Sequence, residues 1–297
     1  MAATTSLRAR LRQDSILVAP GCFDMISGKL VEEAGFEAVY LSGNGHTASH
    51  LGLPDAGYAT LTEMVTRVHN LARSVRIPVI ADADTGYGNA LNARLTVREY
   101  EQAGAAALHI EDQVSPKKCG HTLGREVIGA EEMAVKIEAA VDARRSDDFL
   151  IIARCDARTT LGLDEAIRRG QLYAKAGADL IFVESPESEE EFRRVAEEVD
   201  APVMANMVES GRSPLLSAQR LEQLGFKLVI FPATAWLAAV HAIREVLATL
   251  KQDGTSAARH NRMVTLDDYH RLMGFLEVWQ LEQRFGLKDY AELSESP

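Results

Sequence analysis

The fold of this 297-residue chain is decided by the stretch Glu101-Gln102-Ala103-Gly104-Ala105-Ala106-Ala107-Leu108-His109-Ile110-Glu111. Its first part has the pattern of an amphipathic helix that ends at Gly104, because a glycine there supplies the left-handed cap that turns the chain back toward a sheet. The apolar residues 107–110 are typical of a short buried strand, and a carboxylate ends it. The stretch therefore predicts a helix that returns to a sheet and a strand with a polar carboxyl end.

The same succession of helix, glycine and strand recurs along the chain. Other copies have Gly35, Gly177 and Gly225 between a helical pattern and an apolar run. The eight strands that we expect lie at residues 16–19, 38–41, 78–81, 107–110, 150–153, 180–183, 202–205 and 227–230. Apolar strands that alternate with helices predict a parallel sheet covered on both faces. Eight units in about 250 residues indicate an α/β fold of the (β/α)₈ TIM-barrel type. The Rossmann glycine pattern is incomplete at residues 43–45.

The chain is expected to divide into a catalytic barrel, residues 1–255, and a helical extension, residues 256–297. Residues 253–256 (Asp-Gly-Thr-Ser) interrupt the pattern after the last barrel helix, and one amphipathic helix is predicted from Leu266 to Phe285. Two interpretations of this helix stay open: it caps the end of the barrel, or it packs at a subunit interface. We favour the interface, because a closed barrel has already enclosed its own core.

The composition excludes several classes of function. The net charge of −11 argues against nucleic acid and anionic membranes as partners, whereas an anionic small molecule remains possible if a pocket concentrates positive charge. Cys22, Cys119 and Cys155 lie far apart, so neither a disulfide framework nor a structural zinc site is indicated. No signal segment and no apolar run of membrane-spanning length is seen, so a cytoplasmic location is expected.

Polar residues follow the expected strands, where active sites of these barrels lie. Any one of them alone could be a satisfied structural group, but five strands that end in acids, an amide or arginine at one mouth favour a site. The residues are Ser42 and Gly43 after the second strand, Asp82 and Asp84 after the third, Glu111 after the fourth, Arg154 and Asp156 after the fifth, Glu184 after the sixth and Asn206 after the seventh.

Three of these side chains indicate a cation. Asp82, Asp84 and Glu111 would repel one another in a dry pocket unless a cation neutralises them. Oxygen ligands without a nearby histidine or cysteine suit Mg²⁺, or Mn²⁺ as an alternative. Arg154 offers a two-pronged donor to a substrate carboxylate or phosphate.

A reactive loop is predicted at Lys117-Lys118-Cys119-Gly120-His121, directly after the fourth strand. Cationic neighbours favour a thiolate over a thiol, so the sequence predicts that the pKa of Cys119 is lowered and that the thiol exchanges a proton near neutral pH. The alternative is a small residue in a turn beside a solvated charge run. The position at a strand's carboxyl end favours the active-site loop.

With these residues assembled, nearly the whole chain resembles the isocitrate lyase/phosphoenolpyruvate mutase superfamily. The matching stretches are residues 40–43 (Tyr-Leu-Ser-Gly), 51–55 (Leu-Gly-Leu-Pro-Asp), 82–88 (Asp-Ala-Asp-Thr-Gly-Tyr-Gly), 109–113 (His-Ile-Glu-Asp-Gln) and 117–121. The cysteine of the last stretch marks the lyase branch, since the phosphonate-forming mutases and the oxaloacetate decarboxylases of the superfamily lack it.

The resemblance implies a Mg²⁺-dependent, retro-aldol-type cleavage of a 2-hydroxy acid. It also implies a dimer of dimers, a homotetramer whose last helix is swapped between subunits. The roles that it implies are as follows: Asp82 binds the metal, and Asp84, Glu111 and Asp55 hold its waters; Ser42, Gly43 and Arg154 grip the 2-hydroxycarboxylate; Tyr40 helps to deprotonate the hydroxyl; Cys119 protonates the departing carbanion; and Gly120, His121, Glu184 and Asn206 complete the pocket.

Departures from the family pattern point to the substrate. Phe182, where isocitrate lyases tend to have Trp, suggests room for a methyl group on C2 and therefore pyruvate as the keto product. Thr122 and Leu237 replace arginines expected of methylisocitrate lyases, which disfavours a third carboxylate, because an unpaired buried charge is costly. A dicarboxylate such as 2,3-dimethylmalate fits better. Asn44, where lyases often have Gly, has no interpretation from the sequence.

Other activities stay open. A 2-methylisocitrate lyase, which forms pyruvate and succinate, and an oxaloacetate hydrolase are alternatives within the superfamily. A barrel that binds a metabolite or a partner without turnover is the alternative from another class, but it should have lost metal ligands, and none is missing from the sequence.

Overall fold

The computed structural model describes residues 6–122 and 124–288 and contains a closed barrel of eight parallel strands, β1 to β8 in sequence order. The predicted (β/α)₈ TIM-type fold is confirmed. The strands are β1 (Leu17–Cys22), β2 (Val39–Leu41), β3 (Val79–Asp82), β4 (Ala107–Glu111), β5 (Leu150–Cys155), β6 (Leu180–Val183), β7 (Val203–Asn206) and β8 (Leu228–Phe231).

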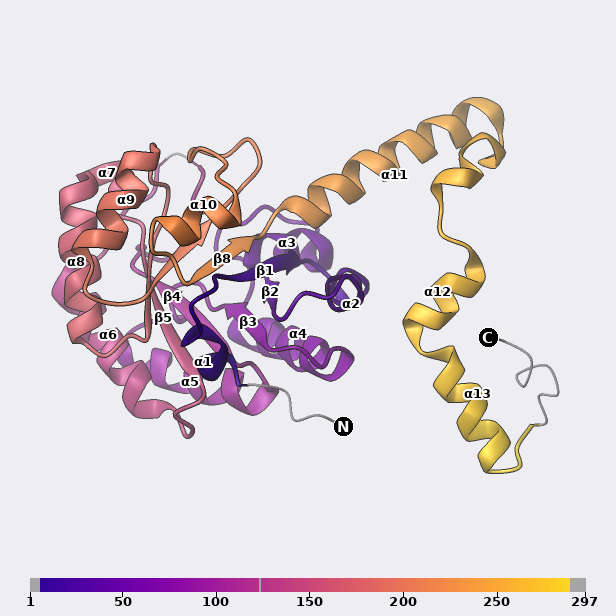
Figure 1. Cartoon of the computed structure of the whole chain (residues 1–297), viewed down its shortest axis with the longest axis horizontal. Helices are drawn as coiled ribbons and strands as arrows, with labels where there is room; N and C mark the ends of the chain where they lie inside the picture. The colour runs from indigo at the N-terminus through magenta and orange to yellow at the C-terminus, as the bar shows by residue number, and fades with distance from the viewer. Residues whose placement is uncertain (1–5, 123, 289–297) are drawn as a thin grey trace. The chain divides into compact units, whose positions relative to one another are not determined.

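Helices surround the strands, and their colours follow the chain once around the barrel (Figure 1). They are α2 (Met25–Glu33), α4 (Leu61–Ser74), α5 (Ala90–Ala103), α6 (Ala130–Ala143), α8 (Leu163–Lys175), α9 (Glu189–Glu198), α10 (Ala218–Gln223) and the beginning of α11 (Thr234–Asp253). Short segments complete this part: α1 (Leu7–Leu11), α3 (Gly43–His46), the π-helix η1 (Thr47–Leu51) and α7 (Arg158–Leu161). Gly104 caps α5 at φ 98°, as the sequence predicts.

The alternation of side chains along each strand positions the site. On β5, Leu150 and Ile152 belong to the apolar cluster inside the barrel, whereas Ile151 and Ala153 pack in the cluster between barrel and helices. Successive side chains of a strand point to opposite faces, so Arg154 continues the inward row. The same alternation brings polar side chains to the mouth at the carboxyl ends of the other strands. Leu7 of α1 joins the inner cluster.

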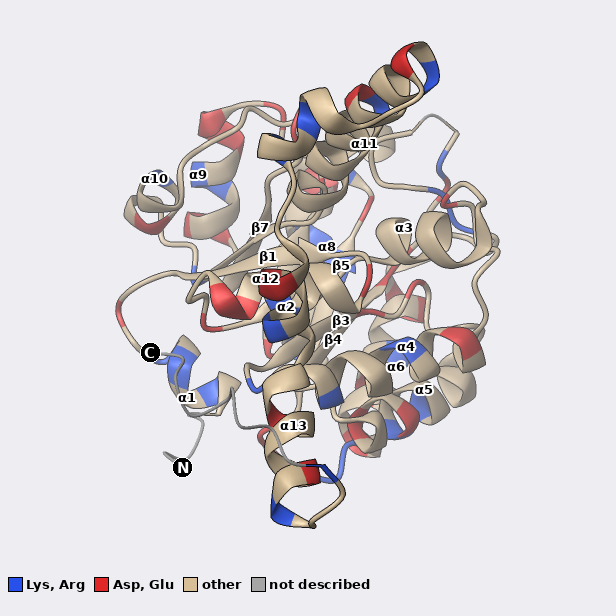
Figure 2. Cartoon of the chain, turned by 90° about the vertical axis from the view of Figure 1, so that its right-hand side faces the viewer, with Lys and Arg blue, Asp and Glu red and all other residues tan. Residues whose placement is uncertain are grey.

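Along the outer helices, Lys and Arg residues are interspersed with Asp and Glu residues (Figure 2). Arg193 on α9, for example, pairs with Glu190 and Glu197. Within the described part of the chain, no helix combines the length and the hydropathy needed to cross a membrane.

By its internal contacts the chain divides into two compact units, Met1–Leu237 and Ala238–Pro297, and the expected functional boundary at residue 255 stays a prediction. In the second unit, η2 (Ala257–Arg262) precedes α12 (Leu266–Met273) and α13 (Phe275–Arg284). The prediction of a single helix over residues 266–285 is wrong, because Gly274 at φ 91° ends α12 and separates it from α13. The predicted swap of this region between subunits is not tested by a single chain.

Candidate active site

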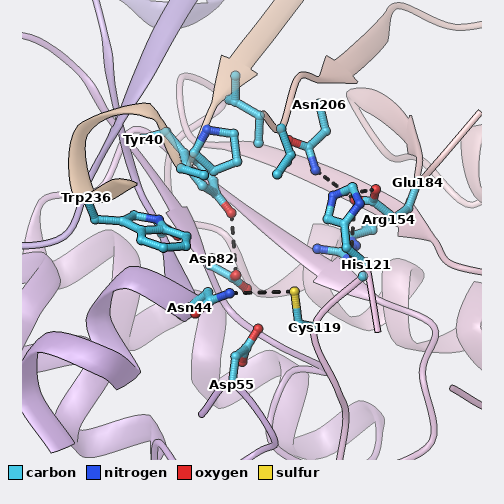
Figure 3. Close-up of a pocket in the computed structure, with 16 residues that line it drawn as sticks. Tyr40, Asn44, Asp55, Asp82, Cys119, His121, Arg154, Glu184, Asn206 and Trp236 are labelled. Atoms are coloured by element: carbon cyan, nitrogen blue, oxygen red, sulfur yellow. Dashed lines mark hydrogen bonds and ion pairs between the residues drawn. The ribbon is translucent and has the colours of Figure 1, made fainter. Parts of the chain in front are cut away.

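A cavity of about 200 Å³ opens at the carboxyl ends of the strands (Figure 3). Most of the residues that the sequence singles out line it: Tyr40, Ser42, Asp55, Asp82, Cys119, Gly120, His121, Arg154, Glu184 and Asn206. Gly43, Asp84 and Glu111 are not among the lining residues but contact some of them. The barrel therefore brings the predicted residues together, although their individual contacts differ from the roles expected in several cases.

The acidic centre consists of Asp82, Glu111 and a histidine that the metal prediction left out. One ligand atom each of Asp82, His109 and Glu111 lies within 4.8 Å of the others. The expectation of no nearby histidine is therefore wrong, because β4 directs both His109 and Glu111 inward. The Nε2 atom of His109 already lies 2.8 Å from the Tyr40 hydroxyl and 3.7 Å from Asp82 Oδ1.

The two carboxylates suit a hard divalent cation. Both oxygens of Glu111 are buried and have no hydrogen-bond partner among the described residues, and burial raises the pKa of this carboxyl well above its usual value. Burial would also raise the pKa of Asp82, but His109, Lys117 and Arg154 hold it below its usual range. A buried carboxylate that has an ion pair with Arg154 but no hydrogen bond, beside an ionised one, provides the oxygen donors that Mg²⁺ or Mn²⁺ prefers.

Gly43 approaches Asp82 so closely that a side chain would not fit. A Cβ atom on Gly43 would lie 2.5 Å from Asp82 Oδ2, and the backbone N–H of Gly43 donates to this oxygen over 3.3 Å. The hydroxyl of Ser42 accepts the backbone N–H of Gly45 over 3.2 Å and so caps α3. This loop therefore positions Asp82 as well as lining the cavity.

Lys117 binds two of the predicted metal-site acids. Its Nζ lies 2.6 Å from Asp55 Oδ1 and 2.8 Å from Asp84 Oδ1, and its side chain is almost fully buried. Burial raises the pKa of Asp84 to about 6, against the effect of Lys117. Asp55 and Asp84 are thus held together by a lysine of the cysteine loop, which the sequence had placed beside the thiol instead.

Cys119 is half-buried, and the predicted lowering of its pKa is wrong. Burial raises the pKa of this thiol, and the two lysines are engaged elsewhere, Lys117 with the acids and Lys118 through Nζ with the carbonyl of Gly124 at 2.9 Å. The thiol instead lies 3.6 Å from the side-chain amide of Asn44, which donates to it. This contact gives Asn44 the structural context that the sequence lacked.

Arg154 is fixed by acids on several sides. Its Nε and Nη2 donate to Asp156 over 2.8 and 3.0 Å, and Nη1 lies 3.2 Å from Glu111. Glu184 lies 3.5 Å from Nη2 and accepts the amide of Asn206 over 2.9 Å. Asp156, noted at its strand end but not assigned a role from the sequence, is therefore the main support of the arginine.

Gly120 and His121 bring the cysteine loop against this arginine. A Cβ atom on Gly120 would lie 2.4 Å from Arg154 Nη2, so a larger residue would displace the guanidinium. His121 Nε2 lies 3.5 Å from Glu184 Oε1, and the backbone N–H of Arg212 donates to His121 Nδ1 over 3.3 Å.

The residues expected to select the substrate do not line the cavity. Phe182 is fully buried, and its ring centroid lies 5.1 Å from the guanidinium carbon of Arg154, so it supports the arginine. Thr122 donates its hydroxyl to the carbonyl of Cys119, and Leu237 is absent from the described lining. The apolar part of the lining consists instead of Val208, Ile230, Pro232, Ala233 and Trp236, and Figure 3 shows Trp236 across the cavity from Arg154.

The sequence could have pointed to part of this wall. Pro232 and Ala233 directly follow β8, and Trp236 lies in the first turn of the helix after it. Residues directly beyond a barrel strand are expected at the mouth. An aromatic residue in the first turn of a barrel helix carries no such signal by itself, because it is equally compatible with the core.

Comparisons with known proteins agree with this geometry. A profile of the family described as phosphoenolpyruvate phosphomutase matches residues 7–251. The chain is 48% identical over 285 residues to 2,3-dimethylmalate lyase of Eubacterium barkeri, which covers 96% of this chain and 99% of that protein. It is 46% identical over 269 residues to 2-methylisocitrate lyase of Aeropyrum pernix, covering 91% and 86% of the two chains.

Solved structures give the same result. The fold matches oxaloacetate acetylhydrolase in complex with 3,3-difluorooxalacetate at a TM-score of 0.92 and 34% identity, over 97% of this chain and 98% of the other. It matches 2,3-dimethylmalate lyase, a PEP mutase/isocitrate lyase superfamily member, at 0.89 and 38%, over 94% and 93%. It matches phosphonopyruvate hydrolase in complex with oxalate and Mg²⁺ at 0.86 and 32%, over 97% and 100%.

The chain belongs to the phosphoenolpyruvate phosphomutase family, within the PEP mutase/isocitrate lyase superfamily. The resemblance predicted from the motifs is confirmed, and both curated relatives bear the name of the predicted enzyme class, lyase.

Proposed function

We propose that this member of the superfamily is a divalent-cation-dependent carbon–carbon lyase that cleaves a 2-hydroxy-2-methyl dicarboxylate of the 2,3-dimethylmalate type to pyruvate and a carboxylic acid. The observation that carries the proposal is one cavity that combines an acidic centre, a fixed arginine and a cysteine with an apolar wall. The first two parts bind a 2-hydroxycarboxylate, the thiol supplies a proton, and the wall accepts alkyl groups. The 48% identity to a 2,3-dimethylmalate lyase supports the same substrate.

Mg²⁺ is the proposed cation, with Mn²⁺ as a possible replacement. Asp82 and Glu111 offer it buried oxygen atoms, and Asp84 and Asp55 are paired with Lys117 nearby. When bound, the cation supplies positive charge that stabilises negative charge developing on the substrate oxygens. The Mg²⁺ complex of phosphonopyruvate hydrolase supports this choice.

Side chains of the protein bind the substrate carboxylate and transfer the protons. Arg154 binds the substrate carboxylate. The Tyr40 hydroxyl lies 2.8 Å from His109 Nε2, and it accepts the proton of the 2-hydroxyl group as it passes its own proton to this ring. Burial lowers the pKa of His109 to about 4, so the imidazole is neutral and can accept that proton. As the C2–C3 bond breaks, the hydroxyl carbon becomes the keto carbon of pyruvate and C3 takes the electron pair. Cys119 then donates its thiol proton to C3, which is why a thiol protonated at neutral pH suits this step.

The apolar wall favours a dicarboxylate over a tricarboxylate. Val208, Ile230 and Trp236 offer hydrocarbon surface where a third carboxylate would need a cation. A 2-methylisocitrate lyase is the second candidate, because Arg212 is a cation that a third carboxylate could use. Its backbone contacts His121 at the cavity, and its side chain is 29% exposed. An oxaloacetate hydrolase is the third candidate, supported by the structural match to oxaloacetate acetylhydrolase at a TM-score of 0.92.

A substrate panel tests the proposal. The purified protein is incubated with MgCl₂ and 2,3-dimethylmalate, 2-methylisocitrate, isocitrate or oxaloacetate, and pyruvate, glyoxylate and oxalate are measured. We expect the highest kcat/KM with 2,3-dimethylmalate or a similar 2-methylmalate and the lowest with isocitrate. A higher value with 2-methylisocitrate would reverse the order of the first two candidates, and oxalate formation would favour the third. Binding without turnover of any compound would support a non-catalytic barrel.

The proposed assembly is a homo-oligomer, a dimer of dimers, in which the region of α12 and α13 packs against another subunit. Apolar side chains of these helices support it, with Phe275 at 42% and Leu276 at 48% exposure. A cytoplasmic location is part of the same proposal, and neither nucleic acid nor membrane is an expected partner.

A further inference from the structure

A second arginine, Arg125, lies on the same loop as Cys119 but plays no part in the proposed reaction. Its Nη1 donates to Asp156 Oδ1 over 2.9 Å and its Nη2 to the Thr159 hydroxyl over 2.6 Å. The side chains of Arg125 and Asp156 are 1% and 0% exposed. Because separating this pair would leave the buried guanidinium of Arg125 without its acid, the contact holds the loop firmly to the end of β5.

The carboxylate of Asp156 serves two arginines. Its Oδ1 accepts from Arg125 Nη1 over 2.9 Å and from Arg154 Nη2 over 3.0 Å, and its Oδ2 accepts from Arg154 Nε over 2.8 Å. The backbone N–H of Asp156 donates to Asp112 Oδ1 over 2.7 Å, so the acid is itself held in place. Asp156 thus connects the arginine of the cavity with the loop that carries the thiol.

The loop has one buried cation on each side of the thiol. Before Cys119, Lys117 binds Asp55 and Asp84, and after it, Arg125 binds Asp156. Gly120, between them, packs so closely on Arg154 that any movement of the loop changes the space around the guanidinium. A planar guanidinium can reach Asp156 and Thr159 together, which the single ammonium of a lysine does less well.

We infer that Arg125 and Asp156 are positioning residues of the proposed lyase reaction. Together they fix the position of the loop that carries Cys119 relative to the guanidinium of Arg154. Neither contacts the substrate. Arg125 keeps the thiol over the cavity, and Asp156 transmits the position of this loop to the arginine that binds the carboxylate. The inference rests on the proposed function for its kinetic consequences, but the geometry that it predicts can be tested without turnover.

The first experiment compares the full-length Arg125→Met and Arg125→Lys variants with Arg193→Met, an exposed arginine of α9, as control. The alkylation rate of Cys119 by iodoacetamide reports loop position, since Cys22 and Cys155 are buried. Titration with oxalate and MgCl₂ counts competent sites, and kcat is expressed per competent site, so that partial unfolding does not imitate the effect. We expect Arg125→Met to raise the alkylation rate at least 10-fold and to lower kcat at least 10-fold, with KM within 3-fold of the wild-type value. Arg125→Lys should recover part of the loss of kcat and part of the change in alkylation rate.

The second experiment separates the two roles of Asp156. Asp156→Asn should change both the alkylation rate and the oxalate dissociation constant at least 10-fold, whereas Thr159→Val, which removes only the second partner of Arg125, should raise the alkylation rate and leave oxalate affinity within 2-fold. The inference is overturned if Arg125→Met matches the control in alkylation and kcat, or if Asp156→Asn alters only one of its two readouts. If no compound is turned over, the proposed function fails, while alkylation and oxalate binding still decide about the two positioning residues.

Discussion

The mouth of the barrel buries charged side chains, whereas α12 and α13 expose apolar ones. Glu111 is 0% and Lys117 4% exposed, but Phe275 and Leu281 are 42% and 40% exposed. Buried charge is costly unless it is paired, and exposed apolar surface is costly unless it is covered. The comparison indicates that the two regions would gain from different partners: small charged ligands would stabilise the mouth, and another apolar surface would stabilise the C-terminal helices.

Removal of the cation should have the largest effect on the mouth. Asp82→Asn, or exhaustive chelation of the unmodified protein, should lower turnover about 10⁴-fold or more, because a bound cation contributes several kcal/mol to the transition state. Turnover of 2,3-dimethylmalate measures the loss, and MgCl₂ or MnCl₂ should restore it only in the chelated wild-type protein. Intact activity after chelation would show that the acids are balanced by Lys117 and Arg154 alone.

The loss of the thiol should follow in size. Cys119→Ser should lower kcat about 10²–10⁴-fold, because a serine hydroxyl is far too weak an acid to replace the thiol in proton donation. Oxalate affinity in the presence of MgCl₂ should stay within a few-fold of the wild type, as the acidic centre and Arg154 are unchanged. Near-normal kcat in this variant would assign Cys119 to the structure of the loop.

The fold and the position of most candidate residues at the mouth could be predicted because both follow local rules. The glycines after four of the helices and the apolar runs defined the strands. A strand's end places the next inward side chain at the mouth, as for Glu111 and Arg154. The partners of these side chains could not be predicted in the same way. Lys117 reaches Asp55 and Asp84 only because loops far apart in sequence meet over the barrel.

Other errors have similar physical causes. Burial, which a motif does not display, outweighs Lys117 in setting the pKa of Cys119. Phe182 was read as a wall of the cavity, but inward residues of a barrel form layers, and its layer lies below Arg154. One continuous helix was predicted over residues 266–285 because the apolar pattern runs on regularly across Gly274. In the structure this glycine ends α12.

Self-association through the C-terminal helices should be weakened when a charged side chain replaces an exposed apolar one. Leu281→Glu should weaken self-association about 30-fold or more, since truncation or charging of a central apolar contact in an interface costs at least about 2 kcal/mol. Light scattering across a concentration series measures the change. Gln280→Glu adds the same charge at an exposed neighbouring position and should have little effect. A wild-type protein that is monomeric at micromolar concentration would remove the proposed interface.

The pH dependence of kcat tests whether burial controls the thiol. A general acid must be protonated, so activity is lost as pH rises through its pKa, and a raised pKa moves this loss to higher pH. The alkaline decline of kcat should therefore begin above about pH 8.5, the usual pKa of cysteine, and fall 10-fold per pH unit beyond it. A decline that begins near pH 7 would mean that the neighbouring lysines do lower the pKa of Cys119.

Asn44 should give the smallest effect at the mouth. Asn44→Ala removes the amide that donates to Cys119 Sγ over 3.6 Å and keeps a residue suited to the short helix α3. A net contribution of about 0.5–1.5 kcal/mol for such a contact corresponds to a decrease in kcat of about 2- to 12-fold.

The KM of the Asn44→Ala variant should change less than its kcat, because the amide contacts the proton donor and not the acids or Arg154. Asn70→Ala, on the exposed face of α4, is the matched control and should leave both constants unaltered. A change confined to KM would mean that Asn44, which lines the cavity, binds substrate instead of orienting the thiol. In that case the departure from glycine at this position contributes to specificity, and the ranking of substrates should change in the same variant.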